Sequence, residues 1–234
     1  YNCLLRRVML GLGNSITGGA ALSDAFLPSS ISNLSVWLRN ATGLTGDPVS
    51  QWDDQSGNDN HAAQSTSGKR GDLIGGGVHL EQSQGDHYDF AEKITMSADH
   101  NFLIGFVMTI ESYDGTQNCI LSDENAEFID FNAAEKIRVN CSSNTTVFEA
   151  DSAQFSIGTQ VAVVVSRNNG STGTIQVFVD GAQPAGSFTN EDNAGAIEFS
   201  VLGARGGTGR FFDGTIHEMV VYDLGTDTHT AGEL

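Results

Sequence analysis

The stretch NFLIGFVMTIE at residues 101–111 decides the fold class, because its apolar side chains recur at every second position. Such alternation over nine residues is typical of a long, half-buried β-strand. The residues on the most apolar face are Phe102, Ile104, Phe106, Met108 and Ile110. The intervening side chains are themselves semi-apolar, so we expect a central strand with a neighbour on each side.

Shorter segments on both sides of this stretch have strand character and are separated by turns rich in Gly, Asn and Asp. The predicted strands are residues 35–39, 48–52, 78–80, 87–90, 101–111, 118–122, 127–131, 136–141, 160–167, 174–180, 197–202 and 215–222. No window of about 12 residues has a helical stripe of apolar side chains. The sequence therefore predicts an all-β fold, a two-sheet antiparallel jelly-roll sandwich.

The first 30 residues differ from the rest, because they are glycine-rich and show no period of 2 or 3.6. We interpret residues 1–30 as an extended N-terminal arm, residues 31–225 as the jelly-roll domain and residues 226–234 as a C-terminal tail. The arm has apolar side chains and two adjacent arginines, which favours a role in attachment to a neighbouring subunit. The candidate partner-binding residues are Arg6, Arg7, Leu10 and Leu12.

The charge of the chain excludes two classes of partner. With 11 Lys+Arg against 29 Asp+Glu, the formal net charge is −18. A nucleic-acid binder needs a basic footprint, and anionic lipid headgroups attract basic segments, so we expect neither partner. No apolar run approaches the ~20 residues of a transmembrane helix, so we expect no membrane insertion.

Four segments, in order along the chain, resemble the laminin-G-like, concanavalin-A-like jelly-roll domains. They are SVWLR with VSQWDDQSGNDNHA (residues 35–39 and 49–62), IQVFVDG (175–181), VLGAR (201–205) and FDGTIHEMVVYD (212–223). The resemblance covers residues 33–225 and implies the fold. Function does not follow from it, because this fold hosts lectins, glycosidases, adhesion modules and virion proteins. The glycine-rich arm ahead of such a domain is similar to phage structural proteins.

A glycoside hydrolase of this fold needs two carboxylates about 5–5.5 Å apart in one groove. The nearest pattern is EFID at residues 127–130, whose spacing places Glu127 and Asp130 on opposite faces of a strand. The spacing of Glu218 and Asp223 likewise places these two carboxylates on opposite faces of a strand. We therefore expect no enzymatic activity.

A calcium site is one interpretation of the polar loop DDQSGNDNH at residues 53–61, and the resemblance favours it, because laminin-G-like domains often bind Ca²⁺ at a sheet rim. The candidate ligands are Asp53, Asp54, Asn58, Asp59 and Asn60. Ca²⁺ takes 6–8 oxygen ligands, which carboxylates and amides supply. The alternative is that these side chains cap and turn their own loop, as Asx residues commonly do.

Glycan contacts need exposed aromatic and polar side chains near loops. Both tryptophans, Trp37 and Trp52, lie in predicted strands among apolar neighbours, so we expect core packing, above all for Trp37. His87, Tyr88 and Tyr113 lie nearer loops and are the candidate glycan contacts.

Cysteine and histidine spacing indicates neither a disulfide nor a zinc site. Cys119 and Cys141 lie near the first and third strands of a predicted meander, farther apart than the ~7 Å Cα limit of a disulfide. None of the six histidines has a partner histidine at ligand spacing.

Together these features predict a non-enzymatic structural or surface-decoration protein of a virion, with surface glycans and self-assembly subunits as its candidate partners. A secreted bacterial carbohydrate-binding or adhesion module is the alternative, and a glycoside hydrolase the third. The expected location is the virion or an extracellular surface, and calcium is the candidate cofactor.

Overall fold

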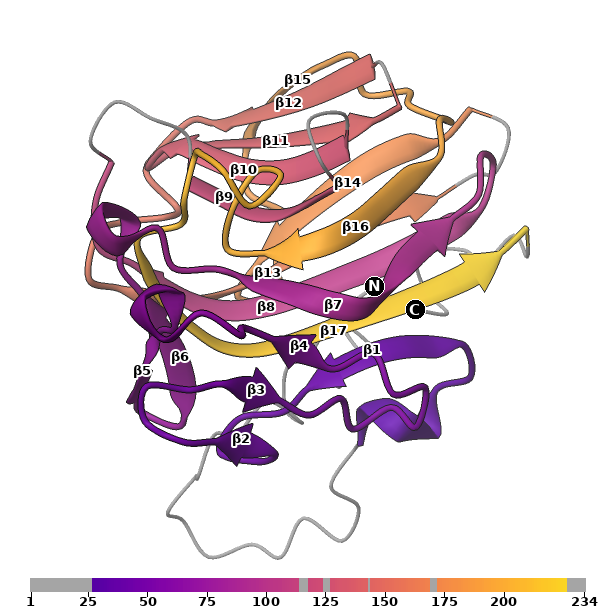
Figure 1. Ribbon diagram of the computed structural model, residues 1–234. Helices are drawn as coiled ribbons and strands as arrows, with labels where there is room; N and C mark the ends of the chain where they lie inside the picture. Colours follow the sequence, from indigo (N-terminus) through magenta and orange to yellow (C-terminus); the bar gives the residue numbers. More distant parts are fainter. Residues whose placement is uncertain (1–26, 114–117, 124–126, 143, 169–171, 227–234) are drawn as a thin grey trace, which may run out of the picture.

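The computed structural model describes residues 27–113, 118–123, 127–142, 144–168 and 172–226. These residues form two antiparallel β-sheets that pack face to face (Figure 1). In the described part of the chain the helical segments are single 3₁₀ turns, η1 (Pro28–Ser30), η2 (Ser67–Lys69) and η3 (Gln82–Gln84). The predicted all-β sandwich is confirmed.

The smaller sheet consists of β1 (Leu34–Leu38), β5 (Asp72–Ile74), β6 (Gly77–Leu80), β8 (Asn101–Ile110), β13 (Gln160–Asn168), β14 (Thr174–Val179) and β17 (Gly214–Gly225). Its strand order is β14-β13-β8-β17-β6-β5, and β1 also pairs with β17. The predicted central strand is β8, which hydrogen-bonds to β13 on one side and β17 on the other.

The larger sheet consists of β2 (Leu44–Thr45), β3 (Gln51–Trp52), β4 (Ala62–Ala63), β7 (Tyr88–Met96), β9 (Asn118–Asp123), β10 (Glu127–Ala133), β11 (Lys136–Cys141), β12 (Asn144–Ala150), β15 (Gly186–Thr189) and β16 (Ile197–Leu202). Its order is β15-β12-β11-β10-β9-β16-β7-β4-β3-β2. As expected, β9, β10 and β11 form a meander, and the described cysteines, Cys119 and Cys141, are free and buried.

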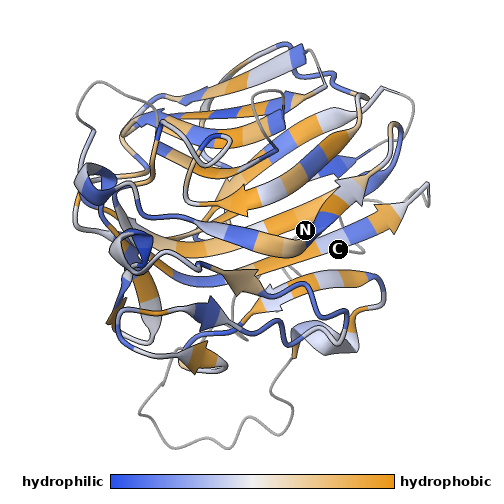
Figure 2. Ribbon diagram, viewed as in Figure 1, coloured by the Kyte–Doolittle hydropathy of each residue, from blue (hydrophilic) through white to orange (hydrophobic). Residues whose placement is uncertain are grey.

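The main core lies between the sheets. Hydrophobic and hydrophilic residues alternate along several of the strands (Figure 2). Phe106 and Met108 of β8 are fully buried there, whereas Thr109 lies on the other face. Across the core, the rings of Phe131 and Phe155 meet edge to face with centroids 4.9 Å apart. Burial of these apolar side chains removes their surface from water, which stabilises the sandwich.

A second apolar cluster covers part of the outer face of the smaller sheet. Its buried members are Trp37, Leu103, Val164, Val220, Tyr222 and Leu224. Tyr222 donates its hydroxyl to the carbonyl of Pro28 at 3.0 Å, and Pro28 is itself buried. Residues 28–30, which the sequence assigned to the arm, therefore belong to the packed structure. Residues 1–26 lie outside the described residues.

Candidate functional site

A polar pocket lies where three strands of the smaller sheet end together. In the register of β6, β17 and β8, Leu80 pairs with Gly214, which in turn pairs with Ile110. The residue beyond each of these positions is acidic, namely Glu81, Asp213 and Glu111. The Glu111 amide donates to the Asp213 carbonyl at 2.9 Å, so the pairing of β8 with β17 extends to these two acidic residues. Strand pairing thus gathers three carboxylates at one end of the sheet.

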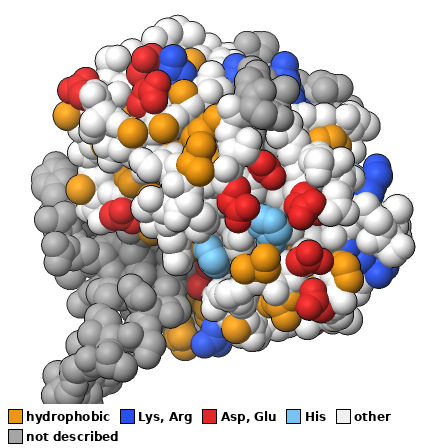
Figure 3. Space-filling view, turned by 90° about the vertical axis from the view of Figure 1, so that its left-hand side faces the viewer, with side chains coloured by type: hydrophobic (Ala, Val, Ile, Leu, Met, Phe, Trp, Pro, Cys, Tyr) orange, Lys and Arg blue, Asp and Glu red, His pale blue; other side chains and the backbone are white. Residues whose placement is uncertain are grey.

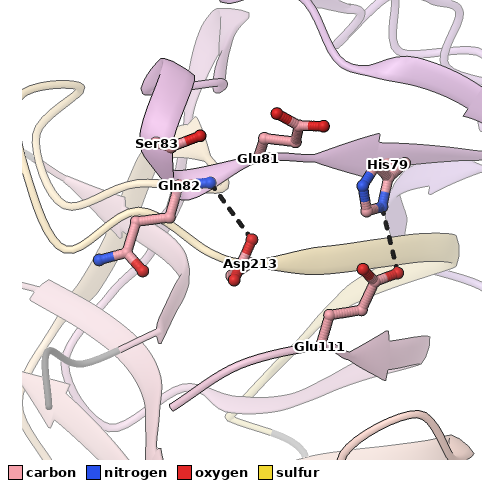
Figure 4. Close-up of a pocket in the computed structure, with 6 residues that line it drawn as sticks. All are labelled: His79, Glu81, Gln82, Ser83, Glu111 and Asp213. Atoms are coloured by element: carbon pink, nitrogen blue, oxygen red, sulfur yellow. Dashed lines mark hydrogen bonds and ion pairs between the residues drawn. The ribbon is translucent and has the colours of Figure 1, made fainter. Parts of the chain in front are cut away.

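The pocket has a volume of about 470 Å³ and is lined by His79, Glu81, Gln82, Ser83, Glu111 and Asp213 (Figure 4). All six side chains are polar, and none of the described lining residues is Phe, Tyr or Trp. Figure 3 shows carboxylates gathered around histidine side chains on this side of the molecule. The surface here offers mainly hydrogen-bond acceptors with a smaller number of donors.

His79 contacts both Glu111, which lines the pocket, and Thr215, which lies beneath it. Its Nδ1 lies 3.4 Å from Oε1 of Glu111 and 3.3 Å from the hydroxyl of Thr215. Thr215 is buried below it, and on the next strand the Thr109 hydroxyl lies 3.2 Å from Nε2 of His217. Burial lowers the pKa of His217. The outer face of the sheet therefore carries two neighbouring pairs of an imidazole and a hydroxyl at this end, on residues whose strands are paired at Thr215 and Thr109.

The η3 turn fixes the opposite wall. The Gln82 amide donates to Oδ1 of Asp213 at 3.3 Å, and the Glu81 amide donates to Oδ2 of Asp86 at 3.0 Å. Gly85 ends the turn in the left-handed conformation, with φ 71°, which glycine adopts without strain. Asp86 is buried, and this burial raises the pKa of its carboxyl. Glu81 is thus positioned by a buried carboxyl that stays outside the pocket lining.

Two of the carboxyls with raised pKa values, those of Glu218 and Asp130, are closed to a substrate by burial. Burial raises the pKa of Glu218 to about 7, yet Glu218 is only 1% exposed and accepts a hydrogen bond from Trp37 Nε1 at 2.7 Å. Burial also raises the pKa of Asp130, which is fully buried against Arg138. A general acid must reach the leaving group, so neither carboxyl is placed for glycoside hydrolysis.

The loop at residues 53–61 uses its acidic side chains to hold itself together. The buried Asp54 carboxylate accepts hydrogen bonds from the amides of Trp37, Ser56 and Asn60 and from the Ser56 hydroxyl, at 2.7–3.0 Å. Asn58 and Asn60 donate to carbonyls of residues 34–35. This geometry favours the loop-capping alternative, while calcium binding stays a prediction.

The remaining candidate calcium ligands point elsewhere. Asp53 accepts a hydrogen bond from Gln51 Nε2 at 2.6 Å, and the Asp59 side chain is 89% exposed. Among the described residues there is no group of three or more His, Cys, Asp or Glu side chains arranged to hold a metal ion.

The predicted glycan contacts His87 and Tyr88 are wrong, because both are buried. Tyr88 is 1% exposed, donates its hydroxyl to the Val49 carbonyl and accepts from the Gly71 amide. His87 is 6% exposed, and its Nδ1 lies 2.8 Å from the Gly85 carbonyl. Tyr113 is half-buried, and its hydroxyl is donated to the Phe155 carbonyl at 2.8 Å. In each of these three residues, a polar side-chain atom is already paired with a backbone carbonyl.

Two further predictions concern Trp37 and the arm. Trp37 is buried, as predicted, with its indole N–H bound to Glu218. The partner-binding candidates Arg6, Arg7, Leu10 and Leu12 lie outside the described residues.

The pocket residues themselves were missed by the sequence analysis. Their signal is that Glu81 and Glu111 each directly follow an apolar strand and Asp213 directly precedes one. That signal identifies a site only once the pairing of the three strands is known.

Comparison with known proteins identifies the class. The family model described as the concanavalin A-like lectin/glucanases superfamily, Laminin_G_3, matches residues 82–226. The chain belongs to this family. A comparison with curated proteins gave no significant match.

Solved structures share the fold at low sequence identity. Domain 4 of AbnA, a GH43 extracellular arabinanase from Geobacillus stearothermophilus, in complex with arabinotriose, aligns at 14% identity with a TM-score of 0.57, covering 86% of this chain and 96% of that one. Trypanosoma rangeli sialidase with the inhibitor DANA aligns at 15% identity and a TM-score of 0.57, covering 98% of this chain but 36% of that chain. The botulinum neurotoxin type G receptor-binding domain aligns at 14% identity with a TM-score of 0.52, covering 84% of this chain and 49% of that chain.

The chain therefore spans about a third of the length of the sialidases that it matches. Within the described residues, no helix has the length and apolar character needed to cross a membrane.

Proposed function

We propose that this chain is a non-enzymatic glycan-binding module whose ligand site is the pocket at the ends of β6, β8 and β17. The observation that carries the proposal is the convergence of Glu81, Glu111 and Asp213 with His79 around one cavity. Carboxylates that accept hydrogen bonds from sugar hydroxyls, together with a few donors, are suited to a neutral sugar.

The fold relatives support this choice of ligand. The arabinanase domain that this chain matches over nearly its whole length was solved with arabinotriose bound. Neutral oligosaccharides are therefore the first probes, because the acidic pocket would repel an anionic sugar placed in it.

The test is a calorimetric titration of the full 234-residue chain with arabinotriose, after a glycan array has been searched for tighter neutral ligands. Glu111→Gln and Asp213→Asn should each weaken binding about tenfold, since a hydrogen bond to a charged group is lost. Asp59→Asn is the matched control, because it removes the same charge from a side chain that is 89% exposed and outside the pocket. Equal effects of all three substitutions would reject the pocket as the site.

The absence of catalysis is tested separately. Incubation with the same oligosaccharides should release no new reducing ends, because no described carboxyl with a raised pKa is placed to protonate a leaving group in the pocket. Sustained turnover that is abolished by Glu111→Gln would make this protein a glycoside hydrolase instead.

The setting that we propose is the surface of a virion, with a secreted bacterial adhesion module as the alternative. The support is the glycine-rich residues 1–26 ahead of the domain, with Arg6 and Arg7 as candidate contacts to an acidic neighbour. Removing residues 1–26 should leave the melting temperature unchanged but abolish incorporation into the particle. Unfolding of the shortened chain would show that these residues belong to the domain.

A further inference from the structure

A row of polar side chains crosses the smaller sheet beside the polar pocket. In the strand register, His79 of β6 lies opposite Asp72 of β5 on one side and opposite Thr215 of β17 on the other. Thr215 in turn lies opposite Thr109 of β8, and Thr109 lies opposite Gln160 of β13. Directly opposite residues of antiparallel strands point to the same face of a sheet, so these five side chains, the polar row, share one face.

The polar row lies on the outer face of the sheet, together with the pocket. Its neighbours along the strands, such as Val78 and Met108, belong to the core between the sheets, so the row points away from that core. His79 belongs to both sites, because it also lines the pocket. Side chains two residues apart along a strand point to the same side, and the three pocket carboxylates stand at that spacing from members of the row. They are Glu81 beyond His79, Glu111 beyond Thr109 and Asp213 ahead of Thr215.

The polar row runs from one margin of the sheet to the other at this level. The last strand on one side is β5, and β14 pairs with β13 only from Val163 onward, so in the described structure the row ends at Gln160. Four strand spacings give it a length of about 19 Å. Its middle is recessed, because Thr215 is buried, whereas the terminal residues Asp72 and Gln160 are exposed.

The same face is apolar at its other end. Leu103 stands six residues before Thr109 in β8 and is buried in the second apolar cluster together with Val164 and Val220. Polar side chains on this face are therefore concentrated at the end that carries the pocket. Neither the polar row nor the described pocket lining contains a Lys or Arg residue, so a neutral ligand meets no unpaired cation there.

The two ends of the polar row have polar groups that a ligand can reach. Asp72 and Gln160 are exposed, and neither side chain makes a hydrogen bond to a described residue. The carboxylate of Asp72 accepts hydrogen bonds, and the amide of Gln160 both donates and accepts them. Sugar hydroxyls also do both, so each end is suited to one further sugar unit.

We propose that the ligand is an extended neutral oligosaccharide that lies across the strands, with inner units at the pocket and outer units at Asp72 and Gln160. The inference rests on the proposed function and adds the direction of the ligand, its minimum length and two recognition residues. A short oligosaccharide fills the pocket alone, whereas a chain that spans about 19 Å also reaches both ends of the polar row.

The experiment is a calorimetric titration of the full 234-residue chain with arabino-, xylo- and cello-oligosaccharides, each from the disaccharide to the hexasaccharide. In the series that binds, the affinity should rise by about tenfold or more with length and level off once the ligand spans the row, because each added hydrogen bond contributes a few-fold. Gln160→Ala and Asp72→Ala should each weaken binding of the hexasaccharide about fivefold. Both variants should bind the disaccharide within about twofold of the parent.

Gln176→Ala is the matched control. Gln176 lies on the same outer face, because its neighbours Ile175 and Val177 are in the core, and it stands opposite Ser166, which stands opposite Leu103. It is therefore about 20 Å from the polar row along the strands, and its removal should change no affinity by more than about twofold.

The possible failures are distinguishable. An affinity independent of ligand length, or equal losses for Gln160→Ala and Gln176→Ala, would overturn the extended site. If binding is still weakened by Glu111→Gln in that case, the proposed function survives without it. Absence of binding in all three series would reject both the pocket and the polar row.

Discussion

The loop at residues 53–61 and the pocket at the ends of β6, β8 and β17 are both acidic, but they use their carboxylates in opposite ways. Asp54 is buried, and its oxygens accept four hydrogen bonds from its own loop and from β1. Glu111 is half exposed, and the one partner found for its carboxylate among the described residues is His79. The comparison shows that acidic residues mark a ligand site only where the protein has not already satisfied them.

Glu218 extends the comparison along β17 itself. It lies five residues after Asp213 on the same chain segment, yet it is buried against Trp37 and resembles Asp54 in being satisfied internally. The segment therefore starts with a carboxylate that lines the pocket, Asp213, and continues to a buried carboxylate, Glu218. The transition coincides with an irregularity in the pairing of β17 with β8 between Ile216 and Glu218.

The largest expected effect is the pH dependence of stability caused by Glu218. Its pKa is raised by burial to about 7 from 4.5, so between these pH values the folded protein holds a proton that the unfolded chain has released. Stability from this group is present below pH 4.5 and is lost as the pH rises towards 7. The loss should approach about 3 kcal/mol.

The measurement is urea unfolding of the parent and of Glu218→Gln from pH 4.5 to 8. The difference between the two free energies of unfolding isolates this carboxyl from all other acids. The parent should lose stability relative to the variant as the pH rises, and a difference that does not change with pH would contradict the closed environment of Glu218.

The second prediction concerns the closed loop. Asp54→Asn replaces an oxygen that accepts hydrogen bonds with an N–H₂ group that faces other donors, so it should lower the free energy of unfolding by about 2 kcal/mol. Asp59→Asn makes the same chemical change at an exposed side chain of the same loop and should cost less than about 0.5 kcal/mol. Equal losses in chemical denaturation would mean that the Asp54 network does not stabilise the fold.

The fold could be predicted from the sequence because its signals are local. Alternation in residues 101–111 and the apolar runs of β13 and β17 indicate strands without knowledge of their partners. Two strands of the larger sheet, β12 and β15, were not predicted. A third strand was predicted too short because its alternation breaks. The strand β7 runs to Met96, but residues 91–93 are all exposed, beside an irregularity in its pairing with β16, and only residues 87–90 were identified as a strand.

The site could not be predicted, because it depends on pairing between distant segments. Glu81, Glu111 and Asp213 meet only through the register of β6, β17 and β8. The loop at residues 53–61 was conspicuous because its acidic residues are adjacent in the sequence. Adjacency carries no information on burial, so the hydrogen bonds of Asp54 and the burial of Tyr88 could not be seen in the sequence.

The third prediction concerns the open pocket. Glu111→Gln and Asp213→Asn should each change the free energy of unfolding by less than about 0.5 kcal/mol, because partly exposed polar contacts contribute little to stability. The expected combination is a loss of ligand binding with an unchanged melting temperature. If either variant unfolds several degrees earlier than the parent, its carboxylate is structural, and the contrast with Asp54 disappears.

The smallest expected effect separates the two interpretations of the loop at residues 53–61. A chain of net charge −18 repels itself at low ionic strength, so its melting temperature should rise with NaCl up to about 0.15 M, where the screening length is about 8 Å. If the Asp54 carboxylate is committed to amide donors, millimolar CaCl₂ should raise the melting temperature no more than NaCl of equal ionic strength.

The decisive variant replaces Asp53 and Asp59 with Asn, because these two carboxylates are not engaged by backbone amides in the described structure. An additional stabilisation by calcium that vanishes in this variant would establish a calcium site there, whereas a calcium effect of equal size in both proteins reflects general screening of the acidic surface.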